Sequence, residues 1–171
     1  MGARMGRGLF KKMFALLACI ASLAIAESVT GVRLGLIATQ VHAQQRQASG
    51  SPGAIISSFR RQNGLQPVRM HPLLQREAQK HSRAMASLQS LTHQIQPGMG
   101  VYARLSAAGF NRPVAENVSM GGSSAAAVIS RWIKSPGHRQ NMLDARYNVF
   151  GFTVATDRSG RRWWTLIIGA Q

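Results

Sequence analysis

Two histidines and one glutamate are the residues of this chain best suited to chemistry: His93, Glu116 and His138. Two imidazoles beside a carboxylate could bind a zinc ion and leave positions for water or a ligand. The same groups could instead form a hydrogen-bonded structural cluster, in which the carboxylate orients a histidine ring. Because 45 residues separate the two histidines, their spacing carries no metal-binding signature of its own. The residues alone leave both interpretations open.

A serine three residues before His138 raises the question of hydrolysis. A Ser–His–acid triad needs a serine within hydrogen-bond reach of a histidine, and Ser135 is close in the sequence. No nucleophile-elbow motif surrounds Ser135. Glu116 is the candidate base, but a buried Glu116 paired with a histidine or an arginine could simply lock a loop. We therefore assign no catalytic residue beyond that candidate.

Other histidines and the tryptophans are expected to have structural roles. His81 lies on an apolar helical stripe, where a core histidine is the expected role, and His71 precedes a proline at a helix start. His42 falls in the N-terminal segment. Trp163 and Trp164 are expected in the core and on the sheet, and because neighbouring strand residues face opposite ways, one of them could be exposed.

The composition limits the classes of protein to which the chain can belong. It has 171 residues, a 45% apolar content and one cysteine. The length allows one domain with a modest extension, and the apolar content supports a packed core. An intrachain disulfide or a multi-cysteine zinc module is excluded. The 21 Lys and Arg against 5 Asp and Glu give a net charge of +16, so nucleic acid, anionic lipid and anionic polymers are possible partners.

The N-terminal residues have the pattern of a secretory signal peptide. A basic start precedes an apolar run over residues 13–26, with small residues behind it. We expect residues 1–43 to be the signal peptide, with cleavage after residue 26 as the alternative. Residues 44–53 are then a flexible lead-in and residues 54–171 the domain.

Two other roles of the N-terminal segment are less favoured. An uncleaved membrane anchor needs about 20 continuous apolar residues, and Glu27 and Arg33 interrupt this stretch. A lipoprotein cleavage box ending at Cys19 is disfavoured because the apolar run continues after it. We therefore expect export to the periplasm or the medium. In those compartments cell-wall polymer or lipid headgroups are more plausible partners than nucleic acid, which we do not expect.

The apolar pattern of the domain predicts helices first and strands last. Helices are expected within 54–64, 72–88, 101–108 and 124–134, with a short helical turn over 138–143. Strands are expected over 114–118, 148–155 and 162–168, the last two as an antiparallel hairpin. In the second helix the apolar residues follow one stripe: Leu74, Ala78, His81, Met85 and Leu88. This order indicates an α+β domain with helices packed on a small sheet.

Five motifs, read in order, resemble the CAP superfamily of cysteine-rich secretory, antigen 5 and pathogenesis-related 1 proteins, also called SCP domains, in a compact bacterial form. They are Ala78-Gln79-x-His81-Ser82-x-x-Met85-Ala86, Leu91-Thr92-His93, Ala115-Glu116-Asn117-Val118, Trp132-x-x-Ser135-Pro136-Gly137-His138-Arg139-x-Asn141-Met142-Leu143, and the pair Gly151-Phe152-Thr153-Val154-Ala155 and Trp163-Trp164-Thr165. The similarity runs from about residue 54 to the C-terminus.

The resemblance implies a three-layer α–β–α sandwich with a small antiparallel sheet, and a shallow cleft that holds two histidines and two acids. By position, His93 is the first histidine, Glu116 the first acid and His138 the second histidine, with Asn117 beside them. The second acid is expected three residues after the helix tryptophan, where this chain has Ser135. The tetrad is therefore incomplete, which weakens any mechanism that needs two carboxylates. A weakly bound zinc, with His93 and His138 as ligands, remains compatible with the resemblance.

Three functional hypotheses follow. The leading one is an exported, monomeric, non-enzymatic CAP protein that binds a small apolar or anionic, lipid-like ligand or an envelope component, since some family members bind sterols or fatty acids. The second is a metal-dependent hydrolase that uses the cleft of His93, His138 and Glu116. The third is a protein interaction module at the cell surface. Alanine at His93 or His138 should abolish turnover in the hydrolase and leave ligand retention intact in the binding protein.

Overall fold

The computed structural model describes residues 37, 39, 40 and 50–171 of the chain. Residues 48–171 form one compact unit of the chain. Most of the expected signal peptide (1–43) and of the lead-in (44–53) therefore lies outside the described residues. In the described part of the chain, no helix has the length and apolar character needed to cross a membrane.

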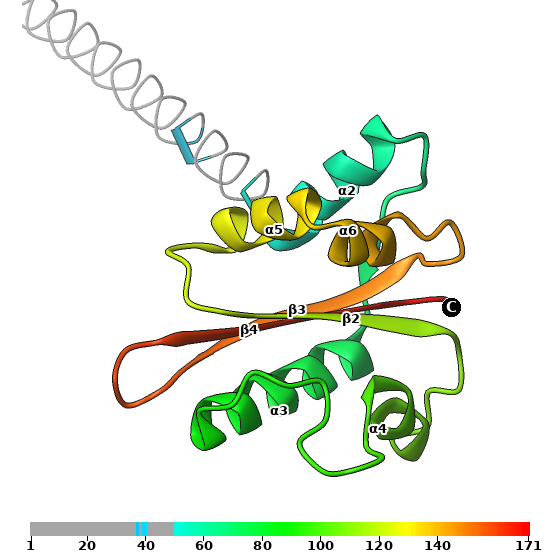
Figure 1. Cartoon of the computed structure of the whole chain (residues 1–171). Helices are drawn as coiled ribbons and strands as arrows, with labels where there is room; N and C mark the ends of the chain where they lie inside the picture. Colours follow the sequence, from blue (N-terminus) through cyan, green and yellow to red (C-terminus); the bar gives the residue numbers. More distant parts are fainter. Residues whose placement is uncertain (1–36, 38, 41–49) are drawn as a thin grey trace, which may run out of the picture. The chain divides into compact units, whose positions relative to one another are not determined.

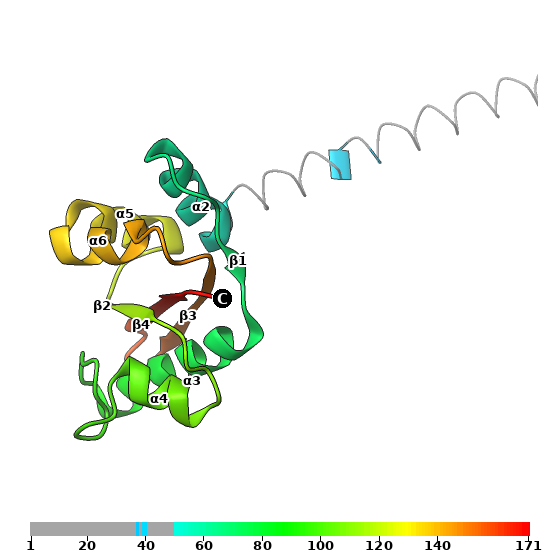
Figure 2. The same ribbon diagram turned by 90° about the vertical axis from the view of Figure 1, so that its right-hand side faces the viewer.

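A four-stranded sheet forms the middle layer of residues 50–171, between two layers of helices (Figures 1 and 2). The strand order is β1-β3-β4-β2, with β1 at Arg69–Met70, β2 at Val114–Met120, β3 at Val149–Thr156 and β4 at Arg162–Gly169. One face is covered by α2 (Pro52–Gln62), α5 (Ala125–Lys134) and α6 (Pro136–Leu143), and the other by α3 (Pro72–Leu88) and α4 (Val101–Ala107). The predicted α+β class and α–β–α layering are confirmed.

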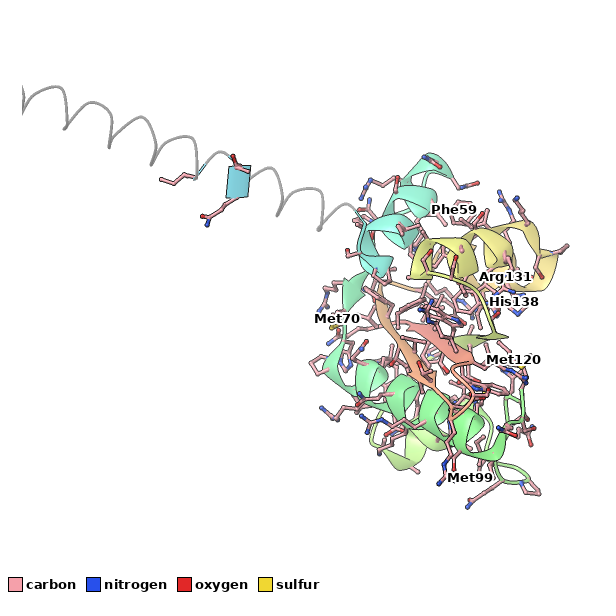
Figure 3. All side chains as sticks on the ribbon, turned by 90° about the vertical axis from the view of Figure 1, so that its left-hand side faces the viewer. Phe59, Met70, Met99, Met120, Arg131 and His138 are labelled. Atoms are coloured by element: carbon pink, nitrogen blue, oxygen red, sulfur yellow. The ribbon has the colours of Figure 1, made fainter. Side chains whose placement is uncertain are left out.

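The sheet is mixed, whereas the sequence predicts an antiparallel one. β4 pairs antiparallel with β2 and β3, but β1 pairs parallel with β3 through Arg69 and Met70. Two residues are too short to show a strand period, so this element left no pattern in the sequence. Met70 on β1 and Met120 on β2 mark opposite edges of the sheet (Figure 3).

The helix starts follow ordinary capping chemistry. The Ser51 hydroxyl accepts a hydrogen bond from the Ala54 amide and caps α2, which begins at residue 52 rather than 54. The Ser124 hydroxyl caps α5 in the same way. His71 accepts a hydrogen bond from the Leu73 amide through Nδ1 and caps α3, which confirms its local role.

Trp163 and Trp164 face opposite sides of the sheet, yet neither is exposed: they are 0% and 4% accessible. Trp163 packs with Met85 of α3, and Trp164 belongs to the core that α2 and α5 share with the sheet. The possibility of one exposed tryptophan was wrong because helices cover both faces. The stripe along α3 is buried from Leu74 to Met85 but ends there, since Leu88 in the last turn is 58% exposed.

Helix α3 lies directly on β3 at Gly151. A Cβ atom on Gly151 would come within 2.3 Å of the Leu74 carbonyl carbon, so only glycine permits this approach. The Gln75 side chain secures the contact: its Nε2 donates to the Phe152 carbonyl at 3.0 Å, and its Oε1 accepts from the Phe152 amide at 2.9 Å. The helix thus satisfies the backbone of β3 where the short β1 has already ended.

Candidate functional site

The carboxylate of Glu116 is the centre of a buried polar cluster between edge strand β2 and helices α3 and α4. Its side chain is 1% exposed. Arg104 of α4 donates from Nη2 to Oε2, and His93 Nδ1 lies 3.0 Å from Oε1. His81 of α3 also lies close, with Nε2 at 3.6 Å from Oε1. The structure thus places the predicted site residues His93 and Glu116 in contact, and it adds His81, for which the sequence predicted a core position only.

Arg104 and His81 also hold the loop over residues 89–100. Arg104 Nη1 donates to the His93 carbonyl at 2.8 Å, and His81 Nε2 lies 2.8 Å from the Thr92 carbonyl. Burial lowers the pKa of His81, and the nearby Glu116 carboxylate only partly opposes this effect. The ring is therefore neutral near pH 7 and donates to Thr92 through a protonated Nε2. The cluster fixes both the loop and the tautomer of His81.

A second group of polar residues, around Asn117, lies on the opposite side of β2. Asn117 Nδ2 donates to the His138 carbonyl at 3.0 Å, and its Oδ1 accepts from Asn141 Nδ2 at 2.9 Å. Asn141 Nδ2 also lies 3.3 Å from the Glu116 carbonyl. The His138 ring meets Ser135 through Nδ1 and Oγ at 2.9 Å. These contacts attach α6 to β2.

The predicted site residues therefore form two groups, on either side of β2. Within residues 50–171, no hydrogen bond or ion pair joins the His138 ring to Glu116. The pKa of His138 is lowered mainly by burial and further by the charge of His93. Ser135 and His138 have the contact that a nucleophile and its base need, but no acid orients His138 in the described part of the chain.

The donor set does not fit a catalytic zinc. Such sites usually take three protein ligands. In the part of the chain that the structure describes, no group of three or more His, Cys, Asp or Glu side chains is placed to hold a metal ion. Glu116, the natural third donor beside His93 and His138, already accepts hydrogen bonds on both oxygens. We therefore derive no step through a metal.

Arg104 is the residue of this site that the sequence did not identify. One expectation was a buried Glu116 paired with a histidine or an arginine. In the structure the Glu116 carboxylate has both kinds of neighbour, because Arg104, His93 and His81 all lie beside it. The chain has 17 arginines, however, and nothing in the spacing between Glu116 and Arg104 distinguishes one of them. Only the folding of α4 against β2 brings the pair together.

A comparison with protein families decides the assignment. The model of the CAP family, described as the cysteine-rich secretory protein family, matches residues 54–168. The chain belongs to the CAP family. The match contains every residue of both groups around β2, so the predicted resemblance is confirmed.

Among curated proteins, this CAP chain is 27% identical over 116 residues to the uncharacterized protein YkwD of Bacillus subtilis. The alignment covers 67% of this chain and 44% of that relative, so the chain matches less than half of the relative's length.

Solved structures share the fold. An outer surface protein of Borrelia burgdorferi has a TM-score of 0.62 at 15% identity and is aligned over 69% of this chain and 88% of its own. An extracellular protein with an SCP domain from Bacillus anthracis has a TM-score of 0.63 at 20% identity, with 70% and 39% covered. A cysteine-rich secretory protein of Staphylococcus aureus has a TM-score of 0.59 at 20% identity, with 70% and 37% covered.

Proposed function

We propose that this CAP protein is exported and that it binds, without catalysis, a small amphipathic ligand. The ligand site is the pocket lined by His81 and Arg104, between α3 and the loop over residues 95–99. Export is supported by the signal-peptide pattern of residues 1–43 and by similarity to proteins described as outer-surface or extracellular.

The pocket combines an apolar wall with polar atoms that have no partner. It has a volume of about 180 Å³, and its apolar side chains are Ala84, Ile95 and Met99. Two buried side-chain atoms of its lining residues, His81 Nδ1 and Arg104 Nε, have no hydrogen-bond partner among the described residues. A buried polar atom without a partner costs about 1–3 kcal/mol. These two atoms are the observation that carries the proposal.

The unpartnered atoms define the head group of the ligand. The Thr92 carbonyl can only accept, so His81 donates through Nε2 and its Nδ1 is left as an acceptor. Arg104 Nε is a donor. We propose a hydroxyl or an amide as this head group, which would donate to His81 Nδ1 and accept from Arg104 Nε once it uncovers these two buried atoms, while the carbon atoms next to it contact Ile95 and Met99. Since ligand pockets usually measure about 300–1,000 Å³, this smaller one suits the head and first carbons of a lipid rather than its whole chain.

Binding is better supported than hydrolysis because the candidate catalytic groups are already engaged. Both oxygens of Glu116 accept hydrogen bonds from Arg104 and His93, and this holds the carboxylate away from a role as a free base. Ser135 and His138 lack an orienting acid in the described part of the chain. The proposal therefore expects His138→Ala to leave ligand binding unchanged.

The test is a titration followed at the methionine methyl groups. We would label the methionines of the full chain with 13C at the methyl carbon and add n-hexanol, with n-pentane as the probe that lacks a head group. The Met99 methyl lines the pocket, whereas Met70 lies at the β1 edge of the sheet and is 60% exposed (Figure 3). We expect n-hexanol to shift the Met99 resonance in a saturable way and to leave Met70 unchanged.

A pair of matched variants separates pocket binding from general partitioning. Ala84→Leu places extra carbon atoms in the pocket, and Ala107→Leu adds the same atoms at the exposed end of α4. Binding should weaken at least about tenfold in the first variant and persist in the second. Equal shifts at Met70 and Met99, or full binding by Ala84→Leu, would contradict the proposal.

A further inference from the structure

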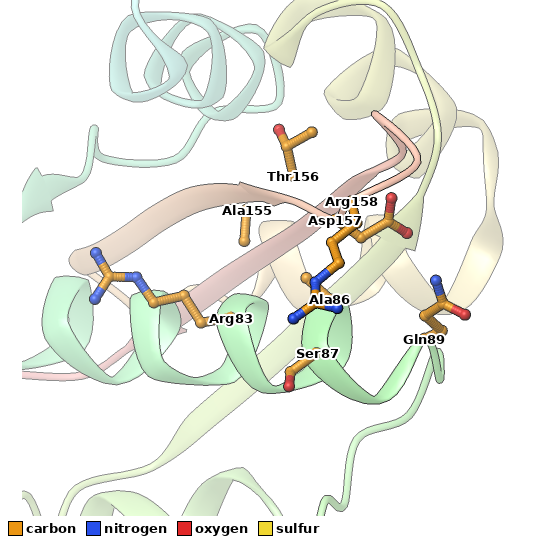
Figure 4. Close-up of a pocket in the computed structure, with 8 residues that line it drawn as sticks. All are labelled: Arg83, Ala86, Ser87, Gln89, Ala155, Thr156, Asp157 and Arg158. Carbon is orange, nitrogen blue, oxygen red and sulfur yellow. The ribbon is translucent and has the colours of Figure 1, made fainter.

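A second cavity lies between the C-terminal half of α3 and the end of the β3–β4 hairpin (Figure 4). Its volume is about 510 Å³, within the range of about 300–1,000 Å³ that is usual for ligand sites. It shares no lining residue with the pocket of His81 and Arg104. We call it the hairpin cleft.

Two arginines without partners line the hairpin cleft. Arg83 projects from α3 and Arg158 from the turn after β3, and within residues 50–171 neither side chain has a hydrogen-bond or ion-pair partner. In Figure 4 the Arg158 side chain extends from the hairpin toward the helix near Ala86, while the Arg83 side chain extends along the helix in the other direction. The guanidinium groups of Arg83 and Arg158 therefore lie toward opposite ends of the cleft.

The arginines stay unpaired because the few acids of the domain are engaged elsewhere. Residues 50–171 contain four carboxylates, and three of them pair with a nearby cation: Glu77 with Lys80, Glu116 with Arg104, and Asp144 with Arg146.

The fourth acid, Asp157, lines the cleft itself but is held by its own turn. Its Oδ1 accepts hydrogen bonds from the Ser159 hydroxyl and amide and from the Arg161 amide, and its Oδ2 accepts one from Trp163 Nε1. These bonds lower the pKa of Asp157 to about 2. Asp157 thus shapes the turn that carries Arg158 and leaves both guanidinium groups available.

We propose that the hairpin cleft binds the anionic groups, phosphate or carboxylate, of a hydroxyl-rich envelope polymer. A guanidinium group presents a planar fork of donors that matches the oxygens of either anion. The remaining polar lining, Ser87, Gln89 and Thr156, supplies two hydroxyls and an amide for sugar or polyol hydroxyls. Only Ala86 and Ala155 are apolar, so an acyl chain finds little surface here.

Two double variants of equal charge test the cleft. Arg83→Gln/Arg158→Gln removes both cleft guanidiniums. Arg61→Gln/Arg112→Gln removes two exposed cations at the end of α2 and before β2. Binding of the full chain to immobilised poly(glycerol phosphate), polygalacturonate and neutral dextran would be measured by surface plasmon resonance at about 0.15 M salt, where long-range attraction is screened. Phosphatidylglycerol vesicles serve as the lipid probe.

We expect the wild-type chain to bind at least one of the two anionic polymers and not dextran. The cleft variant should raise the dissociation constant about tenfold or more, and the control variant less than about threefold. Poly(glycerol phosphate) and polygalacturonate distinguish a phosphate source from a carboxylate source. Equal losses in both double variants would overturn the proposal, because net charge alone would then explain binding. Binding to neither anionic polymer, or cleft-dependent binding to vesicles alone, would overturn it as well.

Discussion

Replacing Arg104 by methionine should destabilise the domain by about 3–5 kcal/mol, the usual cost of removing one partner from a buried ion pair. The Glu116 side chain is 1% exposed, and Arg104 is the only residue that bonds its Oε2 in the described part of the chain. Of the other two neighbours of the carboxylate, His93 is 55% exposed and His81 lies 3.6 Å away. Methionine keeps much of the aliphatic length of arginine, so the loss of stability reflects the unpaired Glu116 carboxylate more than a change in packing.

Removing the charge of the other partner, Glu116, should cost less stability. In Glu116→Gln, Arg104 keeps its hydrogen bond to the His93 carbonyl, and its side chain is 13% exposed, so water can reach it. We expect a loss of about 1–2 kcal/mol. The double variant Arg104→Met/Glu116→Gln contains neither charge. Its cost should therefore fall below the sum of the single costs by at least about 1 kcal/mol, the signature of two coupled residues.

Urea unfolding followed by tryptophan fluorescence measures all three variants, since Trp132, Trp163 and Trp164 are buried in the native state. Far-UV circular dichroism provides the control that each variant retains the fold. Additive costs of the two single changes would refute the reasoning, because they would mean that Arg104 and Glu116 do not stabilise each other. A cost below about 1 kcal/mol for Arg104→Met would refute it too, since the carboxylate would then be well solvated.

Three further predictions concern packing, a buried cation and pH. Gly151→Ala should cost more than about 3 kcal/mol in urea unfolding, because its Cβ would meet the Leu74 backbone at 2.3 Å, and a cost below about 1 kcal/mol would show that α3 moves freely. Arg60→Lys should lower stability by about 3 kcal/mol, nearly as much as Arg60→Met, because the planar guanidinium bonds four carbonyl groups that one ammonium group cannot all reach. An unchanged melting temperature of Arg60→Lys in thermal unfolding would contradict this. Burial lowers the pKa of His81, so the unfolded state takes up its proton first, and stability should fall as pH drops below about 6.5 by at most about 1.4 kcal/mol per pH unit for this group. A His81→Gln variant should show a shallower fall between about pH 7 and pH 5, and an identical slope would contradict the assignment.

The sequence predicted the long elements well because their signals are local. The apolar stripe of residues 72–88 and the β-branched and aromatic runs of the hairpin each repeat within one element, and the structure has α3, β3 and β4 there. It missed β1 because two residues show no period. It also missed the burial of Arg60, which is 0% exposed although it precedes another arginine in an amphipathic helix. The carbonyl groups that hold it come from residues 66 and 142–147, so no local pattern could show them.

For the site, one feature could be predicted from the sequence and another could not. Glu116 and Asn117 are neighbours on a predicted strand, so their side chains must face opposite sides of the sheet. That alternation predicts two hydrogen-bonded groups, one on each side of the strand, and the structure has two. The pairing of Glu116 with Arg104, by contrast, depends on where α4 meets β2.

The arrangement around β2 changes what the family motifs mean in this chain. Glu116 and Arg104 hold the loop over residues 89–100, and Asn117 and Asn141 attach α6 to the strand, so residues that look catalytic in the sequence also hold elements of the fold together. A framework needs fully engaged polar groups, whereas a binding site needs some that are not. Two buried atoms without a hydrogen-bond partner, His81 Nδ1 and Arg104 Nε, lie outside the motif tetrad, and so do the exposed Arg83 and Arg158 of the hairpin cleft. Specificity in this chain should therefore change with the loop over residues 95–99 and with the β3–β4 turn, even when His93, Glu116 and His138 are left intact.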